Sequence, residues 1–118
     1  MSVDIRPMVH ADLPACEAIV AGLPFFQGWG LTGAAAARSL GQALEEERAD
    51  MSVATRDGTI VGFAWVILRG AFDRSAYLRL IAVSGGAQGG GVGRALMGDI
   101  ERRILPACDL ALLVTEGN

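Results

Sequence analysis

Residues 80–96 decide the fold of this chain and read LIAVSGGAQGGGVGRAL. An apolar segment typical of a buried strand runs into six glycines within nine residues. A helix is predicted directly afterwards, because apolar residues recur there at four-residue intervals: Val92, Leu96, Ile100 and Ile104. The first turn of a helix carries unpaired N–H groups and the positive end of the helix dipole. Since glycines leave these amides open to close approach, the segment predicts a site for phosphate or diphosphate.

Two familiar phosphate-binding motifs are excluded. The dinucleotide fingerprint G-x-G-x-x-G fails because Arg94 stands where a third glycine should follow Gly89 and Gly91. A Walker A loop needs a lysine, and all ten basic residues of this chain are arginines. The alternative to an anion site is a glycine-rich turn that merely joins a strand to a helix.

Outward from this segment, apolar periodicity and turn residues predict the remaining elements. Strands are expected at residues 3–8, 51–56, 59–68, 76–83 and 108–115, and further helices at residues 13–23, capped by Asp12, and from Thr32 to about Ala49. Asp57-Gly58 predicts a two-residue hairpin turn. The order β-α-α-β-β-β-α-β predicts an α/β (mixed α+β) fold, with a mostly antiparallel mixed sheet and helices on both faces.

Composition limits the function classes. With 118 residues, 52% of them apolar and 19% charged, the chain is expected to form one domain, residues 1–118. A net charge of −3 argues against binding nucleic acid. One histidine, His10, and two separated cysteines, Cys16 and Cys108, predict no metal site. No apolar stretch reaches the length of a membrane span, so we expect no membrane association. Both cysteines lie in apolar stretches and are expected to be buried free thiols, which fits a reducing cytoplasm.

The glycine segment also carries a resemblance. Residues 88–93, QGGGVG, match the Q/R-x-x-G-x-G/A signature of the GNAT superfamily of acyl-CoA N-acyltransferases. The segments IRP at residues 5–7, ADL at residues 11–13 and DGTIVG at residues 57–62 resemble the start and the hairpin of that family. The resemblance covers essentially the whole chain.

The resemblance implies an acetyltransferase that binds acetyl-CoA between splayed fourth and fifth strands. The pantetheine arm would bond the backbone of Ile81 and Val83, and also Asn118. The N–H of Ala82 or Val83 would polarise the thioester carbonyl. The amine would attack directly, without a covalent enzyme intermediate. The diphosphate would lie on the amides of Gln88, Gly89, Gly90, Gly91, Val92, Gly93 and Arg94.

The acceptor side is less defined by sequence. Phe25, Phe26 and Trp29 form an aromatic loop that either lines the acceptor pocket or caps the core. A cationic acceptor could be attracted by the carboxylates of residues 45–47, which otherwise form a solvated helix end. The sequence predicts a small-molecule or peptide amine as the acceptor.

The sequence does not identify the general base or the general acid of the reaction. Asp73 and Tyr77 are candidates for a catalytic role. The alternative for Asp73 is a residue of a surface turn. His10 is expected to be a surface histidine. The family continues past the asparagine that Asn118 resembles, so we expect either a fragment or a fold completed by a second chain, such as a homodimer. A catalytically inactive CoA-binding module is the alternative function.

Overall fold

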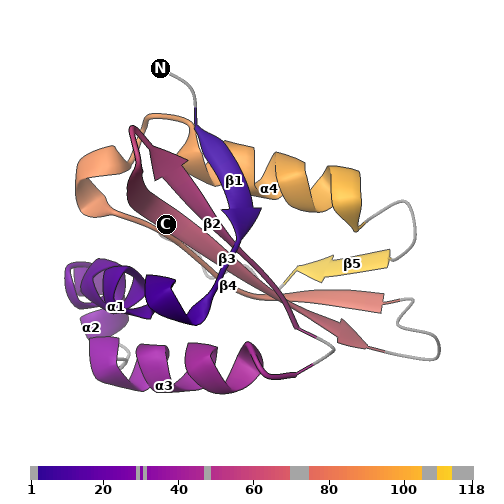
Figure 1. The fold of residues 1–118 in the computed structure, drawn as a ribbon, viewed down its shortest axis with the longest axis horizontal. Coiled ribbons are helices and arrows are strands. Elements are labelled where there is room, and N and C mark those ends of the chain that lie inside the picture. Colours follow the sequence, from indigo (N-terminus) through magenta and orange to yellow (C-terminus); the bar gives the residue numbers. More distant parts are fainter. Residues whose placement is uncertain are drawn as a thin grey trace.

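The computed structural model describes residues 3–28, 30, 32–46, 49–69, 75–104 and 109–112. The order of elements along the chain is the predicted one, with additional short helices (Figure 1). The strands are β1 (Asp4–Pro7), β2 (Ala49–Arg56), β3 (Thr59–Arg69), β4 (Ser75–Val83) and β5 (Asp109–Leu112). The helices are α1 (Leu13–Ala21), α2 (Pro24–Gln27), α3 (Gly33–Ala43) and α4 (Val92–Arg103), with 3₁₀ turns η1 (His10–Asp12) and η3 (Gly85–Ala87).

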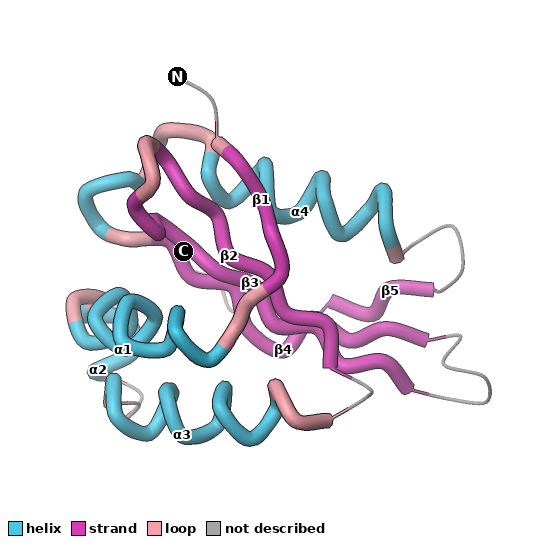
Figure 2. Tube along the Cα trace, in the orientation of Figure 1, coloured by secondary structure: helices cyan, strands magenta, loops and turns pink. Residues whose placement is uncertain are grey.

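The five strands form one sheet in the order β1-β2-β3-β4-β5. Strands β1 to β4 pair antiparallel, and β5 pairs parallel to β4, so the predicted mixed sheet is confirmed. Figure 2 shows α4 on one face of the sheet and α1, α2 and α3 on the other. Each face buries its own apolar cluster, one around Leu40 and Phe63 and the other around Leu96 and Ile100.

The β2–β3 hairpin has the predicted turn. Asp57 has φ 53° and Gly58 has φ 80°, the two positive values that a type I′ turn requires. This turn brings Arg56, the last residue of β2, to the same end of the sheet as the end of β4, because Gly62 of β3 pairs with Val83.

A bulge divides β4 into two halves. Trp65 of β3 pairs with Leu80, whereas the next residue, Val66, pairs with Leu78, so Arg79 is an extra residue in β4. Such a bulge bends the strand and increases its twist. In the described residues, β5 pairs only with the half before the bulge, Ser75 to Leu78. The residues that follow Leu112 lie outside the described residues, so the predicted splay of the two strands stays a prediction.

Several local predictions are wrong. The segment after Leu23, predicted as a loop, begins with the short helix α2, which Pro24 starts at its first position. Helix α3 is capped by Thr32 as predicted but ends at Ala43, because Ala49 already pairs with β3.

Asp12 does not cap α1 with its side chain. Its carboxylate instead accepts two 2.8 Å hydrogen bonds from the Arg6 guanidinium and one from the N–H of Val9. The predicted cap therefore joins β1 to the turn before α1.

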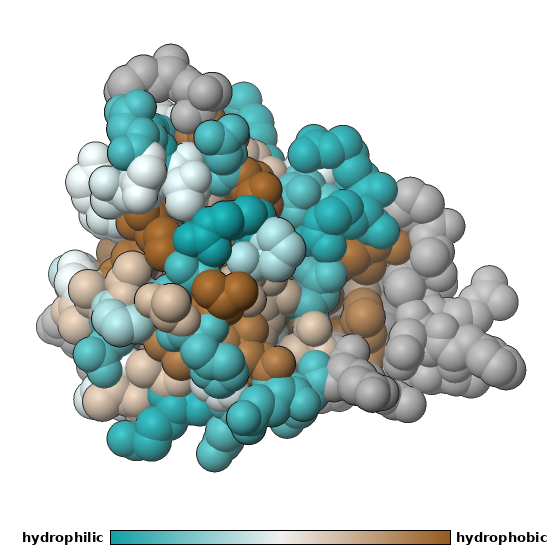
Figure 3. All heavy atoms as spheres, viewed as in Figure 1, coloured by the Kyte–Doolittle hydropathy of each residue, from teal (hydrophilic) through white to brown (hydrophobic). Residues whose placement is uncertain are grey.

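The surface seen in Figure 3 mixes hydrophilic and hydrophobic side chains rather than presenting one continuous apolar patch. Within the described part of the chain, no helix is both long enough and apolar enough to cross a membrane.

Candidate functional site

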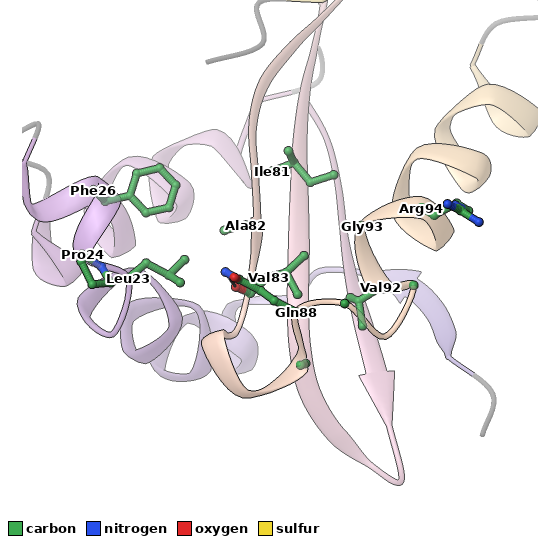
Figure 4. A pocket seen from close by; sticks show the side chains of 13 residues that line it. Leu23, Pro24, Phe26, Ile81, Ala82, Val83, Gln88, Val92, Gly93 and Arg94 are labelled. Atoms are coloured by element: carbon green, nitrogen blue, oxygen red, sulfur yellow. Dashed lines mark hydrogen bonds between the residues drawn. The ribbon is translucent and has the colours of Figure 1, made fainter. Parts of the chain in front are cut away.

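A cavity of about 830 Å³ opens between the junction of α1 and α2, the end of β4 and the start of α4 (Figure 4). It is lined by residues of all three regions: Leu23, Pro24, Phe26, Ile81, Ala82, Val83, Ala87, Gln88, Gly89, Gly91, Val92, Gly93 and Arg94. The glycine segment that decides the fold therefore also forms most of the cavity.

One wall of the cavity is the half of β4 that follows the bulge. Ile81, Ala82 and Val83 line it, and Figure 4 shows Phe26 and Leu23 facing Ala82 across the space. These β4 residues pair with β3 on one side. Successive residues of an antiparallel strand direct their N–H groups to opposite sides. One amide of the Ala82–Val83 pair is therefore directed away from β3.

The loop between β4 and α4 is held by three backbone hydrogen bonds. Ser84 donates to Val61 at 2.8 Å, Ala87 to Ser84 at 2.9 Å, and Gly90 to Ala87 at 3.3 Å. These bonds join β3, β4 and η3, so the loop has a defined path before α4 begins.

Two glycines of this loop adopt the left-handed backbone region, with φ 84° at Gly89 and φ 83° at Gly91. An ideal Cβ at either position would meet no atom within 4 Å. Backbone conformation rather than space therefore requires glycine at both positions. Because no side chain covers them, these two residues leave the loop open toward the cavity.

The first turn of α4 provides unpaired amides. Gly91 is the N-cap residue, and its carbonyl accepts the first helical hydrogen bond from Ala95 at 2.9 Å. The N–H groups of Val92, Gly93 and Arg94 have no intrahelical acceptor at these positions. Together with the helix dipole, they form a site suited to an anion.

Gln88 ties the loop to β4. Its side-chain Nε2 donates to the carbonyl oxygen of Val83 at 3.3 Å. The family resemblance assigns the backbone of Val83 to the pantetheine arm, and this carbonyl already has one partner within the chain. A carbonyl oxygen has two lone pairs, so one acceptor position remains.

The lining is apolar apart from backbone groups, Gln88 and one cation, Arg94. No carboxylate is among the described lining residues. The side chains with shifted pKa values lie elsewhere. Arg6 lowers the pKa of Asp12, and burial raises the pKa of the Cys16 thiol to about 12. The described lining thus combines amides suited to an anion with apolar side chains, and it contains no acidic group.

The structure brings together most of the residues predicted to bind the coenzyme. Of that set, Gly90 belongs to the loop but does not line the cavity, and Asn118 lies outside the described residues. Of the predicted acceptor residues, Phe26 lines the cavity, Phe25 is in α2 with no described side chain, and Trp29 lies outside the described residues.

The other candidates that the structure describes are not among the residues that line the cavity. Tyr77 pairs through its backbone with Ile67 and Ala111, in the half of β4 before the bulge, and Asp73 lies outside the described residues. His10 is exposed in η1, as expected of a surface histidine. The described carboxylates of residues 45 and 46 do not line the cavity.

Sequence reasoning missed Leu23, Pro24 and Ala87. Leu23 is the last residue of the helix predicted at residues 13–23, but in the structure it follows the end of α1 and forms the N-cap of α2. The aromatic residues that follow Pro24 are the sequence feature that could have predicted this side of the cavity. Nothing in the local pattern marked Ala87, which the turn of η3 buries.

The chain was compared with protein-family models, curated proteins and solved structures. A family model described as "Acetyltransferase (GNAT) domain" matches residues 26–116. Among curated proteins, none matches the sequence.

Several solved structures share the fold. An acetyltransferase from Thermus thermophilus is 20% identical with a TM-score of 0.82, over 100% of this chain and 79% of that one. The ribosomal-protein-S18-alanine N-acetyltransferase of Escherichia coli is 23% identical with a TM-score of 0.77, over 99% and 70%. The PaiA N-acetyltransferase of Thermoplasma acidophilum in complex with coenzyme A is 15% identical with a TM-score of 0.77, over 100% and 82%.

Proposed function

This chain belongs to the GNAT acetyltransferase family, and from that membership we propose that it transfers an acetyl group from acetyl-CoA to a primary amine. Acyl transfer from an acyl-CoA is the activity that the family supports. Our proposal goes further in three respects: the donor is acetyl-CoA, the acceptor is a primary amine, and the amine attacks the thioester directly.

The observation that carries the proposal is the joining of two features in one cavity. At one end, Gly89 and Gly91 leave the amides of the first turn of α4 uncovered, which suits a diphosphate. At the other end, Ile81 to Val83 form an extended stretch of backbone that follows the bulge and lines the cavity. An acyl-CoA has the matching parts in the same order, a diphosphate followed by an arm that contains amides.

The chemical step needs little from side chains. A thioester is already activated, so holding it and the amine in line supplies much of the rate acceleration. The amide of Ala82 or Val83 that is directed away from β3 would donate to the thioester oxygen and stabilise the negative charge that develops there. The amine nitrogen forms the new bond to the acyl carbon, and the thiolate leaves with the proton that the amine loses.

Three measurements test the proposal. Isothermal titration with acetyl-CoA should show binding, and amide NMR signals of residues 89–94 should shift on titration. Thiol release from acetyl-CoA should then increase in the presence of a panel of primary amines. The proposal is wrong if acetyl-CoA does not bind, or if binding leaves the signals of residues 89–94 unchanged.

One observation favours a second candidate, a CoA-binding module without catalytic activity. The described cavity lining holds no carboxylate and no histidine that could remove a proton from the amine. This candidate predicts the same binding but no amine-dependent thiol release. Loss of the amine proton to water would allow catalysis without such a side chain. In that case the rate of thiol release should rise with pH toward the pKa of the amine, which would support the transferase.

The identity of the acceptor and the completion of the fold by a second chain stay predictions. The apolar side chains of Leu23 and Phe26 at one wall support an acceptor with an apolar portion beside its amine. Completion of the fold by a second copy is tested by light scattering during size-exclusion chromatography, in which a monomer mass would contradict it.

A further inference from the structure

Arg56 contacts the coenzyme loop from outside the signature segment. It is the last residue of β2, immediately before the hairpin turn. Its Nη2 donates to the carbonyl oxygen of Gly90 at 3.2 Å, across 34 residues of sequence. This is a contact between the β2–β3 hairpin and the glycine loop, and local sequence patterns do not predict it.

The guanidinium of Arg56 occupies the space that a side chain at Gly90 would need. An ideal Cβ on Gly90 would lie 2.6 Å from Nη2 and 3.4 Å from Cζ of Arg56. Gly89 and Gly91 differ, since a Cβ at either would meet nothing and their positive φ angles explain the glycines. A side chain at Gly90 would therefore displace the Arg56 guanidinium, and its Cβ would also lie 3.3 Å from the backbone oxygen of Ala87.

Among the residues that the structure describes, Arg56 also differs from Arg6 and Arg103 in its partners. Arg6 is paired with Asp12, and Arg103 is paired with Asp50 and Asp99. Within the described residues Arg56 has a carbonyl acceptor but no carboxylate. In the described part of the chain its Nε is buried without a hydrogen-bond partner, which is an unfavourable state for a donor.

We propose that Arg56 is a positioning residue for the coenzyme diphosphate: it holds the Gly90 carbonyl away from the cavity and places a positive charge behind the loop. The inference rests on the proposed function, since it assumes that the loop binds an acyl-CoA. A carbonyl turned toward the cavity would repel the diphosphate, and the guanidinium prevents this by keeping that carbonyl engaged. The same cation favours the anion electrostatically.

The test compares ligands with and without a diphosphate. Calorimetric dissociation constants are measured for CoA and for pantetheine with the native protein, with Arg56→Met and with Arg56→Lys. Arg56→Met should weaken CoA binding about tenfold, as expected for loss of a charged hydrogen bond, and leave pantetheine binding unchanged. Arg56→Lys keeps the charge and one donor, so it should restore part of the affinity. Arg38→Met, which removes an arginine on α3, is the charge-matched control and should not change CoA affinity.

A second variant guards against misfolding. Gly90→Ala should displace the guanidinium and weaken CoA binding in the native background, yet add little in the Arg56→Met background, because the two residues act through one contact. Equal losses in both backgrounds would overturn the proposal. So would CoA affinity within twofold of the native value in Arg56→Met, or a parallel loss of pantetheine affinity. Failure of the native protein to bind CoA would instead overturn the proposed function.

Discussion

Replacing Gly93 by valine should weaken coenzyme binding at least fivefold without unfolding the protein. Gly93 lies in the first turn of α4 and lines the cavity. An ideal Cβ there would meet only Val83 Cγ2, at 3.8 Å, which is an ordinary contact. A first methyl group therefore fits between helix and strand.

Valine adds two methyl groups about 1.5 Å beyond that Cβ. A methyl aimed at Val83 would overlap it, so the side chain must turn its methyls toward the cavity at Gly93. Crowding of this kind costs about 1–3 kcal/mol, which corresponds to roughly a 5- to 150-fold loss of affinity. Valine is a few tenths of a kcal/mol better than glycine in a helix, so the melting temperature should stay within about 2 °C.

The assay is a pair of measurements on each variant: a dissociation constant for CoA by calorimetry and a melting temperature by circular dichroism. Gly98→Val makes the same change in the same helix away from the cavity, where a Cβ lies 3.5 Å from Arg102, and should leave affinity intact. Gly93→Ala should also bind CoA, because its Cβ fits. The reasoning is refuted if Gly93→Val binds CoA within twofold of the native protein, or if Gly98→Val loses affinity equally.

Three further predictions address stability and reactivity. Gly62→Ala should destabilise the fold by about 1–3 kcal/mol in urea denaturation, because its Cβ would lie 2.9 Å from a side chain of α4 and 3.0 Å from a backbone oxygen of β4; unchanged stability would contradict this packing. Arg6 lowers the pKa of Asp12 below its ordinary 3.8, so the stability it provides is present above about pH 4 and is lost as pH falls through the folded pKa. Asp12→Asn should therefore lower the melting temperature at pH 7 and reduce its fall between pH 5 and 2, whereas parallel curves would argue against the ion pair. Cys16 is fully buried with its pKa raised to about 12, so peptide mass spectrometry should show its alkylation at pH 8 only at the rate of unfolding; rapid labelling of the folded protein would show that the thiol is accessible.

The glycine segment shows how far local patterns reach. The strand, the loop and the start of α4 at Val92 follow from apolar periodicity and from glycines that only a special backbone would need. The hairpin turn at Asp57-Gly58 follows for the same reason, since its φ angles are a property of a few adjacent residues. These features depend on near neighbours in the chain, so the sequence alone predicts them.

The wrong predictions, the Asp12 cap and the end of the second helix near Ala49, share one cause. Asp12 is a good cap by residue type, but Arg6 of β1 competes for its carboxylate with two hydrogen bonds. Ala49 suits a helix, but pairing with Ile67 of β3 places it in a strand. In both cases a partner distant in sequence outweighs a weak local preference.

By itself, the sequence determined the order of strands and helices, the turn that joins β2 to β3, and the open amides at the start of α4, because each arises within a few consecutive residues. Only the tertiary structure decided that Leu23 and Phe26 face β4, that Arg79 forms a bulge, and that Arg56 lies against Gly90. These depend on contacts between segments far apart in the chain. Such contacts follow from how whole elements pack and pair, and no local repeat of residues records them.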